Sequence, residues 1–550
     1  MSTARVMRSS AVMAAGTMTS RILGFVRASL LLAAVAPGGS ADTFSVANTV
    51  PNAIYILLAG GVLNAILVPQ ITRAARRLDG GREYVDRLLT MATVVLFGLT
   101  VIVTMAAPLL IRLYATGRWS DQQVQLGVVF ALWALPQVFW YGLYTLLGQV
   151  LNARGSFGPF MWAPAVNNLV GIAGLIAFIA AAGTGDRAIS AWTPGSIALL
   201  AGTATLGVAV QALVLLPFLR ATGVRWRPRW GLRGFGLRTA GRVAGWTFAT
   251  VLLQQLGFIV ISRVTTAGGS LTQSAGSGIK TGKAIYDNAF LLFMLPHSLV
   301  AVSLVTALFT RMSVAAADDR IDEVRDDLSL GLRVTGLATV LCTTAFLALG
   351  PDLARALFAG NNAGDTNQVA YTTMAMMIGL VPFSAQYLFQ RVFYVFEDAR
   401  TPFLIQLPIV VTWSVGNLLS LWLLPPHLIV IGVAAAMSAA NVLGAALAAG
   451  LLTRRLGHLD GRRVMGVHAR LVTAGISGGL AAWLVSRGLH LVLGDTRLTA
   501  LTASAVGGAV LVGGYVGVLR LLRVRELDEA VVPLLRRVRS DNAEPAGHPA

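Results

Sequence analysis

The first half of this chain is repeated in its second half, in segments apolar enough to cross a membrane. Three pairs of segments carry the repeat at an offset of 241 to 243 residues: LAGGVLNAILVPQITRAA (58–75) with LVAVSLVTALFTRMSVAA (299–316), APLLIRLYATG (107–117) with GPDLARALFAG (350–360), and RGSFGPF (154–160) with EDARTPF (397–403). Matches in the same order at a nearly constant offset indicate a duplicated unit. Duplicated membrane halves are typical of transporters, whose substrate site lies between the halves.

The composition agrees with a membrane protein. Hydrophobic residues make up 55% of the chain and charged residues only 12%, whereas a soluble domain has about 25% charged residues. Fourteen segments are long and apolar enough to be spans of roughly 20 residues: 9–35, 43–70, 86–112, 122–151, 160–183, 193–219, 240–265, 281–310, 330–358, 368–396, 402–424, 428–452, 467–488 and 497–521. The sequence therefore predicts an all-α polytopic membrane protein with 14 transmembrane helices. The chain has one cysteine, Cys342, so it has no internal disulfide.

The repeat divides these helices into two lobes of six, followed by two helices that are not duplicated. An even number of helices in each unit predicts two parallel copies, related by an axis along the membrane normal. We expect an N-terminal lobe at 1–219, a basic linker at 220–239, a C-terminal lobe at 240–453, two further helices at 454–522 and a basic, disordered tail at 523–550.

Arginine is concentrated in alternate loops between the predicted helices. The basic loops are 73–87, 220–242 and 454–470, and the tail after residue 520 is also basic. The positive-inside rule therefore places both termini in the cytoplasm. Because these arginines belong to separate loops, the net charge of +19 does not indicate a nucleic-acid partner, and attraction to anionic lipid headgroups is favoured.

Two arginines interrupt the first predicted span. Arg21 lies near its centre, Arg27 follows, and Gly24 lies between them around the helix axis. A cation in the membrane is costly unless it faces a wet cavity or a partner. The pattern predicts a groove with a bare backbone floor, suited to a phosphate or diphosphate. In the alternative, Arg27 reaches the membrane interface and Arg21 pairs with an acid on another helix.

The second predicted span has a polar stripe. Asn48, Asn52 and Tyr55 fall within about 60° of one another at the helical period. Asp42 stands at the entrance of this helix, where its carboxylate either caps the helix or pairs with an arginine. We expect the stripe to line a substrate cavity.

Polar side chains also occur in the seventh and eighth spans. Lys283 and Asp287 are four residues apart, which makes them an ion-pairing couple on one helix face. Two interpretations remain open. The two side chains contact substrate, or they lie at the mouth of the helix in contact with water. Gln255 and Arg263 in the seventh span face the cavity or a neighbouring helix, and Arg263 is also close enough to the helix end to reach water.

Several segments resemble signatures of one transporter family: SRILGFVR (20–27), ADTFSVANTVPN (41–52), LNARGSFGPFMWAPAVNN (151–168) and RVFYVFEDARTP (391–402). They are similar to the MurJ (MviN) family of bacterial lipid II flippases, in the multidrug/oligosaccharidyl-lipid/polysaccharide exporter superfamily. The resemblance implies that lipid II, the undecaprenyl-diphosphate-linked muropeptide, moves from the inner to the outer leaflet of the plasma membrane by alternating access. It implies no bound cofactor, a cation gradient or the membrane potential as driving force, and membrane lipids and cell-wall synthesis proteins as candidate partners.

By this resemblance Arg21 and Arg27 match the arginines of the family's first helix, and Asp42 matches its aspartate before the second helix. The family's proposed sodium site uses carboxylate and amide groups of helices 7 and 11. Here the eleventh helix offers Asn417 and the seventh offers only glutamines, so the sequence does not predict a sodium site.

The chain departs from the family pattern at three places. Tyr55 stands where many members have an arginine, Gly60 where many have an acid, and Leu291 where the eighth helix has its cavity arginine. The resemblance therefore implies a cavity with less fixed positive charge. Lys283 and Arg263 are the candidates to replace the missing cations.

Two other classes of function were weighed. A related exporter of another polyprenyl-linked saccharide, or of drugs, would have the same architecture, although twelve helices would be more typical of it. A membrane enzyme would need clustered acids or histidines at one face of the membrane. The six histidines are scattered over His297, His427, His458, His468, His490 and His548, so the sequence does not favour an enzyme.

Overall fold

The computed structural model describes residues 3–59, 82–224, 226–231, 241–276, 278–358 and 363–527. Within these ranges every regular element is a helix, as the all-α prediction requires. The chain forms two compact units. One comprises Met1–Leu291, Leu357–Thr372 and Ala399–Ala436, and the other comprises Leu292–Ala356, Thr373–Asp398 and Met437–Ala550.

The first unit contains most of the helices that surround the predicted site. They are α1 (Thr3–Ala34), α2 (Gly39–Leu58), α4 (Arg82–Met105), α5 (Ala107–Tyr114), α6 (Asp121–Ala134), α7 (Gln137–Ala153), α8 (Gly158–Ala182), α9 (Pro194–Ile197), a π-turn (Ala198–Gly202), α10 (Thr203–Leu213), α11 (Leu215–Ala221), α12 (Gly241–Ser274) and α18 (Arg400–Leu423), with short 3₁₀ turns at Ile189–Ala191 and Pro426–Leu428.

The second unit contains α14 (Val302–Ala317), α15 (Ile321–Leu357), α17 (Leu380–Val395), α20 (Gly461–Leu493) and α21 (Arg497–Leu521). Three helices contribute residues to both units: α13 (Lys283–Pro296), which continues into a π-turn at His297–Ala301, α16 (Ala363–Met377) and α19 (Ile429–Leu456). The predicted lobes, 1–219 and 240–453, stay a prediction. The two compact units are defined by which residues pack together, and they do not show which segments are copies of each other.

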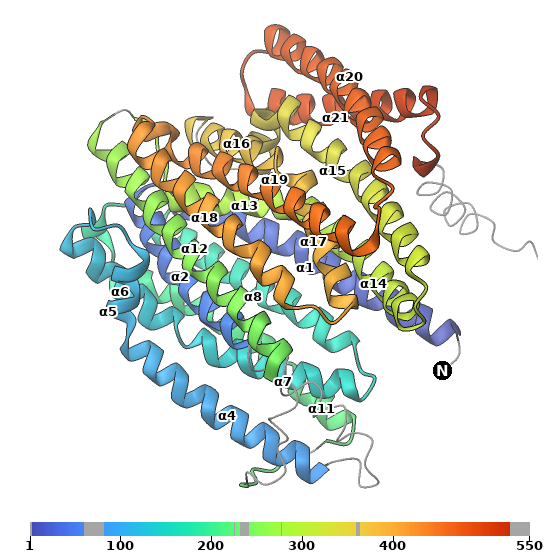
Figure 1. The fold of residues 1–550 in the computed structure, drawn as a ribbon. Coiled ribbons are helices and arrows are strands. Elements are labelled where there is room, and N and C mark those ends of the chain that lie inside the picture. Colours follow the sequence, from blue (N-terminus) through green and yellow to red (C-terminus); the bar gives the residue numbers. More distant parts are fainter. Residues whose placement is uncertain are drawn as a thin grey trace, which may run out of the picture. The chain divides into compact units, whose positions relative to one another are not determined.

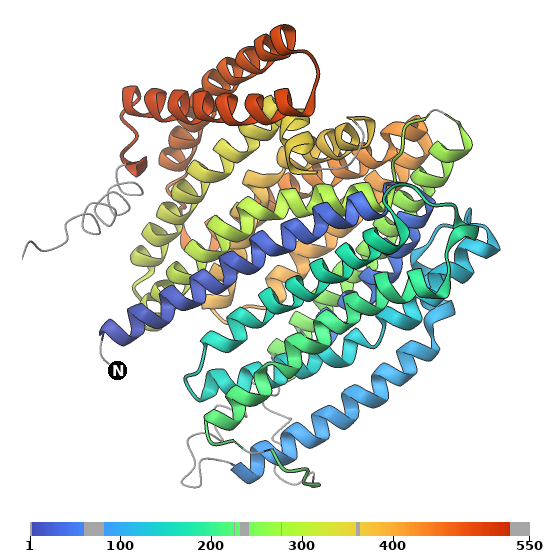
Figure 2. The same cartoon turned by 180° about the vertical axis from the view of Figure 1, so that it is seen from behind.

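Small residues let the helices of the first unit approach one another closely. α8 packs along both α1 and α10, and α12 packs along α18 (Figures 1 and 2). A Cβ added at Gly174 of α8 would lie 2.2 Å from the Thr203 Oγ1 atom of α10, and one at Gly257 of α12 would lie 3.0 Å from Val410 of α18. Close backbone approach of this kind is the usual basis of helix association in membranes.

In the second unit α20 and α21 lie side by side (Figure 1). Gly478 of α20 faces the backbone of α21, since a Cβ there would be 3.0 Å from the Leu511 carbonyl oxygen. A buried ion pair between Arg333 of α15 and Glu526 holds the residues that follow α21. The two predicted unduplicated helices therefore form a packed pair.

Among the described residues, twelve helical segments are long and apolar enough to cross a membrane. The bent pair α16 and α17, at 48° to each other, would be a thirteenth. The predicted count of fourteen is not confirmed. Residues 60–70 of the predicted span 43–70 lie outside the described residues, as do most of the repeat segment 58–75, part of the linker and most of the tail. The predicted span 86–112 is broken between α4 and α5, where Pro108 begins a new helix.

Candidate functional site

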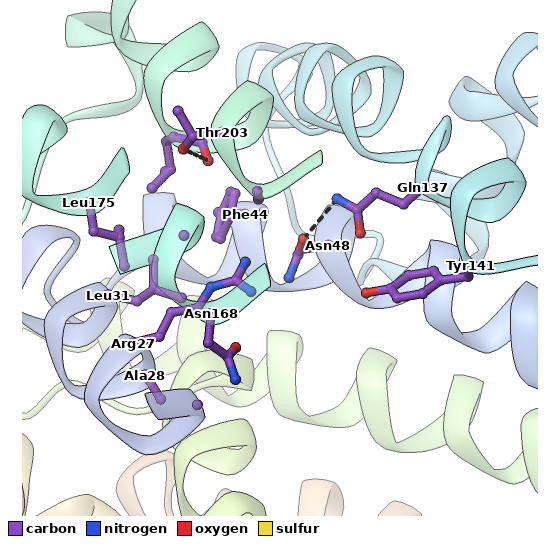
Figure 3. Close-up of a pocket in the computed structure, with 14 residues that line it drawn as sticks. Arg27, Ala28, Leu31, Phe44, Asn48, Gln137, Tyr141, Asn168, Leu175 and Thr203 are labelled. Carbon is purple, nitrogen blue, oxygen red and sulfur yellow. Dashed lines mark hydrogen bonds between the residues drawn. The ribbon is translucent and has the colours of Figure 1, made fainter. Parts of the chain in front are cut away.

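A cavity of about 240 Å³ lies among α1, α2, α7, α8 and α10 (Figure 3). Its polar lining consists of Arg27, Asn48, Gln137, Tyr141, Asn168 and Thr203. Gly24 contributes bare backbone to the same wall. Of the three residues of the predicted groove, Gly24 and Arg27 line this cavity and Arg21 does not.

Arg27 reaches this cavity across the surface of α8. Its Nη1 donates to the Asn167 Oδ1 atom at 3.4 Å, and a Cβ added at Gly171 would lie 2.6 Å from the Arg27 Nε atom. No described Asp or Glu forms an ion pair with it. The guanidinium therefore keeps its positive charge uncompensated by the protein, in a place where an anionic ligand fits.

A second cavity of about 230 Å³ lies between α1, α2 and the first half of α13. It shares Ala28, Leu31, Phe44 and Asn48 with the first cavity, so the two are contiguous. Its polar lining is Ser45, Asn48, Thr49, Asp287 and Asn288. Leu291 also lines it, so an apolar side chain occupies this part of the cavity wall.

Asp42 does not have either of its two predicted roles. It is 3% exposed, and α2 has no side-chain cap at its own N-terminus. Its Oδ1 atom instead accepts a hydrogen bond from the Ala284 backbone N–H, in the first turn of α13, at 2.8 Å. A carboxylate at a helix N-terminus satisfies a free N–H and favours the helix dipole. Asp42 thus joins the entrance of α2 to the entrance of α13.

Lys283 and Asp287 are ion-paired on α13, as their spacing predicts. The ammonium of Lys283 is 0% exposed and lies 5.2 Å from the centre of the Phe258 ring, so the alternative in which Lys283 contacts water at the helix mouth does not hold. Asp287 also accepts a hydrogen bond from Ser45 of α2. We call Asp42, Ser45, Ala284, Lys283 and Asp287 the α2–α13 latch.

The latch joins positions that the sequence repeat pairs with each other. Asp42 and Ala284 are 242 residues apart, and so are Ser45 and Asp287; the repeat offset is 241 to 243 residues.

Further contacts tie α12 to α5 and the segment after it. Ser262 donates to the Tyr114 carbonyl oxygen at 2.8 Å, and the backbone N–H of Thr116 donates to Thr266 at 3.1 Å. Arg263 donates to the Arg112 carbonyl oxygen at 3.1 Å and lines neither cavity. The structure therefore gives Arg263 a role at this helix end instead of in the cavity.

The remaining predicted residues are divided between the cavities and other surroundings. Asn48 lines both cavities and accepts from the Gln137 Nε2 atom at 3.5 Å (Figure 3). Tyr55 shares a 2.8 Å hydrogen bond with Thr145. Asn52 is exposed and Gln255 is partly buried, and neither lines a cavity.

Arg21 is exposed and lines neither cavity. In this conformation the structure therefore brings one of the two predicted guanidinium groups, that of Arg27, to a cavity, and substrate contact by Arg21 stays a prediction. Six residues separate Arg21 from Arg27 by about 9 Å along the helix axis and by about a third of a turn around it.

Four polar residues of the first cavity were not predicted: Gln137, Tyr141, Asn168 and Thr203. Among these four, Asn168 belongs to one of the segments that resemble the family, 151–168. Its Nδ2 atom donates to the Ser20 carbonyl oxygen at 2.8 Å, which links α8 to α1. The sequence does contain a signal for a polar wall here. It is the pair of asparagines, Asn167 and Asn168, in an otherwise apolar helix.

Comparison with known proteins identifies the relatives of this chain. A probable lipid II flippase MurJ of Vibrio cholerae is 25% identical over 548 residues, covering 95% of this chain and 97% of the relative. The lipid II flippase MurJ of Burkholderia cenocepacia is 28% identical and covers 73% of this chain and 75% of the relative.

Solved structures show the same fold. A structure of lipid II flippase MurJ in an inward closed conformation has a TM-score of 0.71 at 17% identity, over 93% of this chain and 99% of that one. An inward-facing multidrug exporter of the MATE family has a TM-score of 0.60 at 16% identity, over 80% of this chain and 96% of that one. The model of the family described as lipid II flippase MurJ matches residues 34–501, and the chain therefore belongs to the MurJ family.

Proposed function

We propose that this protein moves lipid II across the bacterial plasma membrane, from the inner to the outer leaflet. Its membership of the MurJ family over residues 34–501 carries the proposal. The charge of the first cavity supports it, because lipid II has a diphosphate and Arg27 has no acidic partner among the described residues. The likeness to multidrug exporters is one of fold alone, so it does not favour a drug as substrate.

In this proposal the diphosphate binds Arg27, and the muropeptide occupies the cavities beside α2 and α13. Arg presents a planar set of donors that matches two phosphate oxygens at once. Asn48, Gln137 and Asn168 offer neutral hydrogen-bonding groups to the sugars. A flippase breaks no covalent bond in its substrate, so we assign binding residues and no catalytic ones.

The α2–α13 latch closes one route into the cavities. By the positive-inside rule both termini are cytoplasmic, which places the latch at the outer end of the helices. We propose that the latch opens to release lipid II outward. The proposed driving force is the membrane potential or a cation gradient, with no bound cofactor, and cell-wall synthesis proteins are proposed partners.

Complementation tests the proposed function. A bacterium whose own lipid II flippase is depleted should grow when it expresses this chain, because flipping is the only step that is missing. Growth should be lost again with an equally expressed Arg27→Ala variant. Failure of the wild-type protein to restore growth, although it reaches the membrane at normal abundance, would refute the proposal.

Topology is tested with single cysteines. With Cys342 replaced by Ala, a cysteine at the exposed position Ala188 should react with a membrane-impermeant thiol reagent in intact cells. A cysteine at the exposed position His458 should react only after the cells are opened. The reverse pattern would invert the proposed direction of transport.

A further inference from the structure

The groups that hold Arg27 in its cavity are electrically neutral. Its Nη1 atom donates to an amide oxygen, that of Asn167, at 3.4 Å. Its other close neighbour on α8 is the bare backbone of Gly171. Arg27 is partly buried, and ionisable groups inside membrane spans usually pair with one another, so an arrangement of amide and backbone around this guanidinium requires an explanation.

Asn167 is itself fixed by a second amide. Its Nδ2 atom donates to the Gln211 Oε1 atom of α10 at 2.8 Å, and the two residues are only 8% and 4% exposed. Gly207 of α10 makes room for the asparagine, since a Cβ there would lie 2.4 Å from the Asn167 Oδ1 atom. In this arrangement the oxygen of the Asn167 amide faces Arg27 and its Nδ2 atom faces Gln211.

We infer that Asn167, held by Gln211, and the bare backbone of Gly171 position the Arg27 guanidinium toward the cavity without neutralising it. This inference rests on the proposed function, because it assigns the free charge to the diphosphate of the substrate. Asn167 and Gln211 are positioning residues, since neither lines the cavity. Their chemistry determines how strongly the cavity attracts an anion.

Neutrality is the essential property of this pair. A carboxylate at position 167 would accept the same hydrogen bond from Arg27, but it would form a permanent ion pair with the guanidinium. The diphosphate would then have to compete with that carboxylate and would meet its negative charge. An amide orients the guanidinium equally well and leaves the full charge to the ligand.

The Asn167→Asp variant tests the inference, because it changes the charge and not the shape. Gln211 can turn its amide so that its Nε2 atom donates to the new carboxylate, which keeps the hydrogen bonds satisfied. With the full-length purified protein in lipid nanodiscs and undecaprenyl diphosphate as the probe, the dissociation constant should rise at least tenfold. The melting temperature should not fall, since the partly buried cation gains a partner.

A double-mutant cycle separates positioning from a general effect on the fold. In an Arg27→Gln background there is no charge to neutralise, so Asn167→Asp should change the affinity by less than about threefold. An equal loss of affinity in both backgrounds, or unchanged binding by Asn167→Asp alone, would overturn the inference. Absence of binding by the wild-type protein would instead contradict the proposed function.

The role of Gly171 is tested separately. Gly171→Ala places a methyl group against the Arg27 Nε atom and should lower the affinity for undecaprenyl diphosphate at least tenfold. Gly98→Ala is the matched control, because Gly98 is also inside a helix and a Cβ there meets nothing within 4 Å. Equal affinities of the two variants would show that Gly171 does not position Arg27.

Discussion

Replacing Arg27 by Ala should abolish transport while the protein still reaches the membrane. The variant removes the cation of the first cavity, and truncating one member of a hydrogen-bonded charge pair, here the proposed pair of Arg27 with the substrate diphosphate, costs about 2–5 kcal/mol. A loss of 2 kcal/mol corresponds to a decrease of about 30-fold in substrate affinity. The measurement is growth of a flippase-depleted bacterium, with membrane abundance determined by immunoblot.

Arg27→Lys and Arg21→Ala complete this test. Lysine keeps the charge but lacks the planar fork, so Arg27→Lys should restore growth only partly. Arg21 is exposed and lines neither cavity in this conformation, so Arg21→Ala should have the smaller effect of the two alanine variants. Normal growth with Arg27→Ala at normal abundance would exclude Arg27 as the diphosphate ligand.

Replacing Asp42 by Ala should open the α2–α13 latch and impair transport. Removing this acceptor leaves the buried Ala284 N–H without its partner, and an unsatisfied buried donor costs about 1–3 kcal/mol. The closed state should therefore lose population relative to open states by a factor of about 5 to 150. A cysteine at Thr49, in the second cavity, reports this as faster labelling by an impermeant thiol reagent added from outside.

The exposed pair Lys280 and Asp186 provides the control. The Lys280 Nζ atom lies 3.0 Å from the Asp186 Oδ2 atom, so this ion pair also joins the segment before α13 to another part of the first unit. Both side chains, however, reach water. Exposed ion pairs contribute about 0–1 kcal/mol, so Asp186→Ala should accelerate labelling of the Thr49 cysteine only slightly. If Asp42→Ala labels no faster than Asp186→Ala, the latch does not control access.

Lys283 has a different place from the one that its sequence suggested. Its ammonium pairs with Asp287 and is fully buried, so it belongs to the latch in this conformation. Its proposed role as a replacement cation for the diphosphate stays a prediction for other states of the transport cycle. Leu291 lines the second cavity, and Arg27 is the one Lys or Arg among the described residues that line the two cavities.

The local chemistry of the site could be predicted from the sequence, but its long-range pairings could not. A cation inside an apolar span is costly, which indicated Arg27, and the spacing of four residues indicated the Lys283–Asp287 pair. The partner of Asp42 is a backbone N–H 242 residues away, and no side chain marks it. Only the fold brings the entrance of α13 to Asp42.

The amide residues were harder to predict for a related reason. Gln137 and Asn168 lie in helices whose periodicity does not reveal which side faces a cavity, because lipid and protein interior are both apolar. Arg21 and Arg27 share one helix, but their separation along its axis leaves only Arg27 in the cavity. Helical periodicity predicts on which side of its own helix a side chain lies. It does not predict which neighbouring helix that side chain contacts.

The central claim is that this chain delivers lipid II to the outer leaflet, with Arg27 binding its diphosphate. The most direct test measures lipid II on the outer leaflet of flippase-depleted cells, as the fraction cleaved by an impermeant enzyme that hydrolyses lipid II. Expression of the wild-type chain should restore cleavage, and Arg27→Ala at equal abundance should not. Cleavage that stays at the depleted level with the wild-type chain, or that both proteins restore equally, would contradict this account.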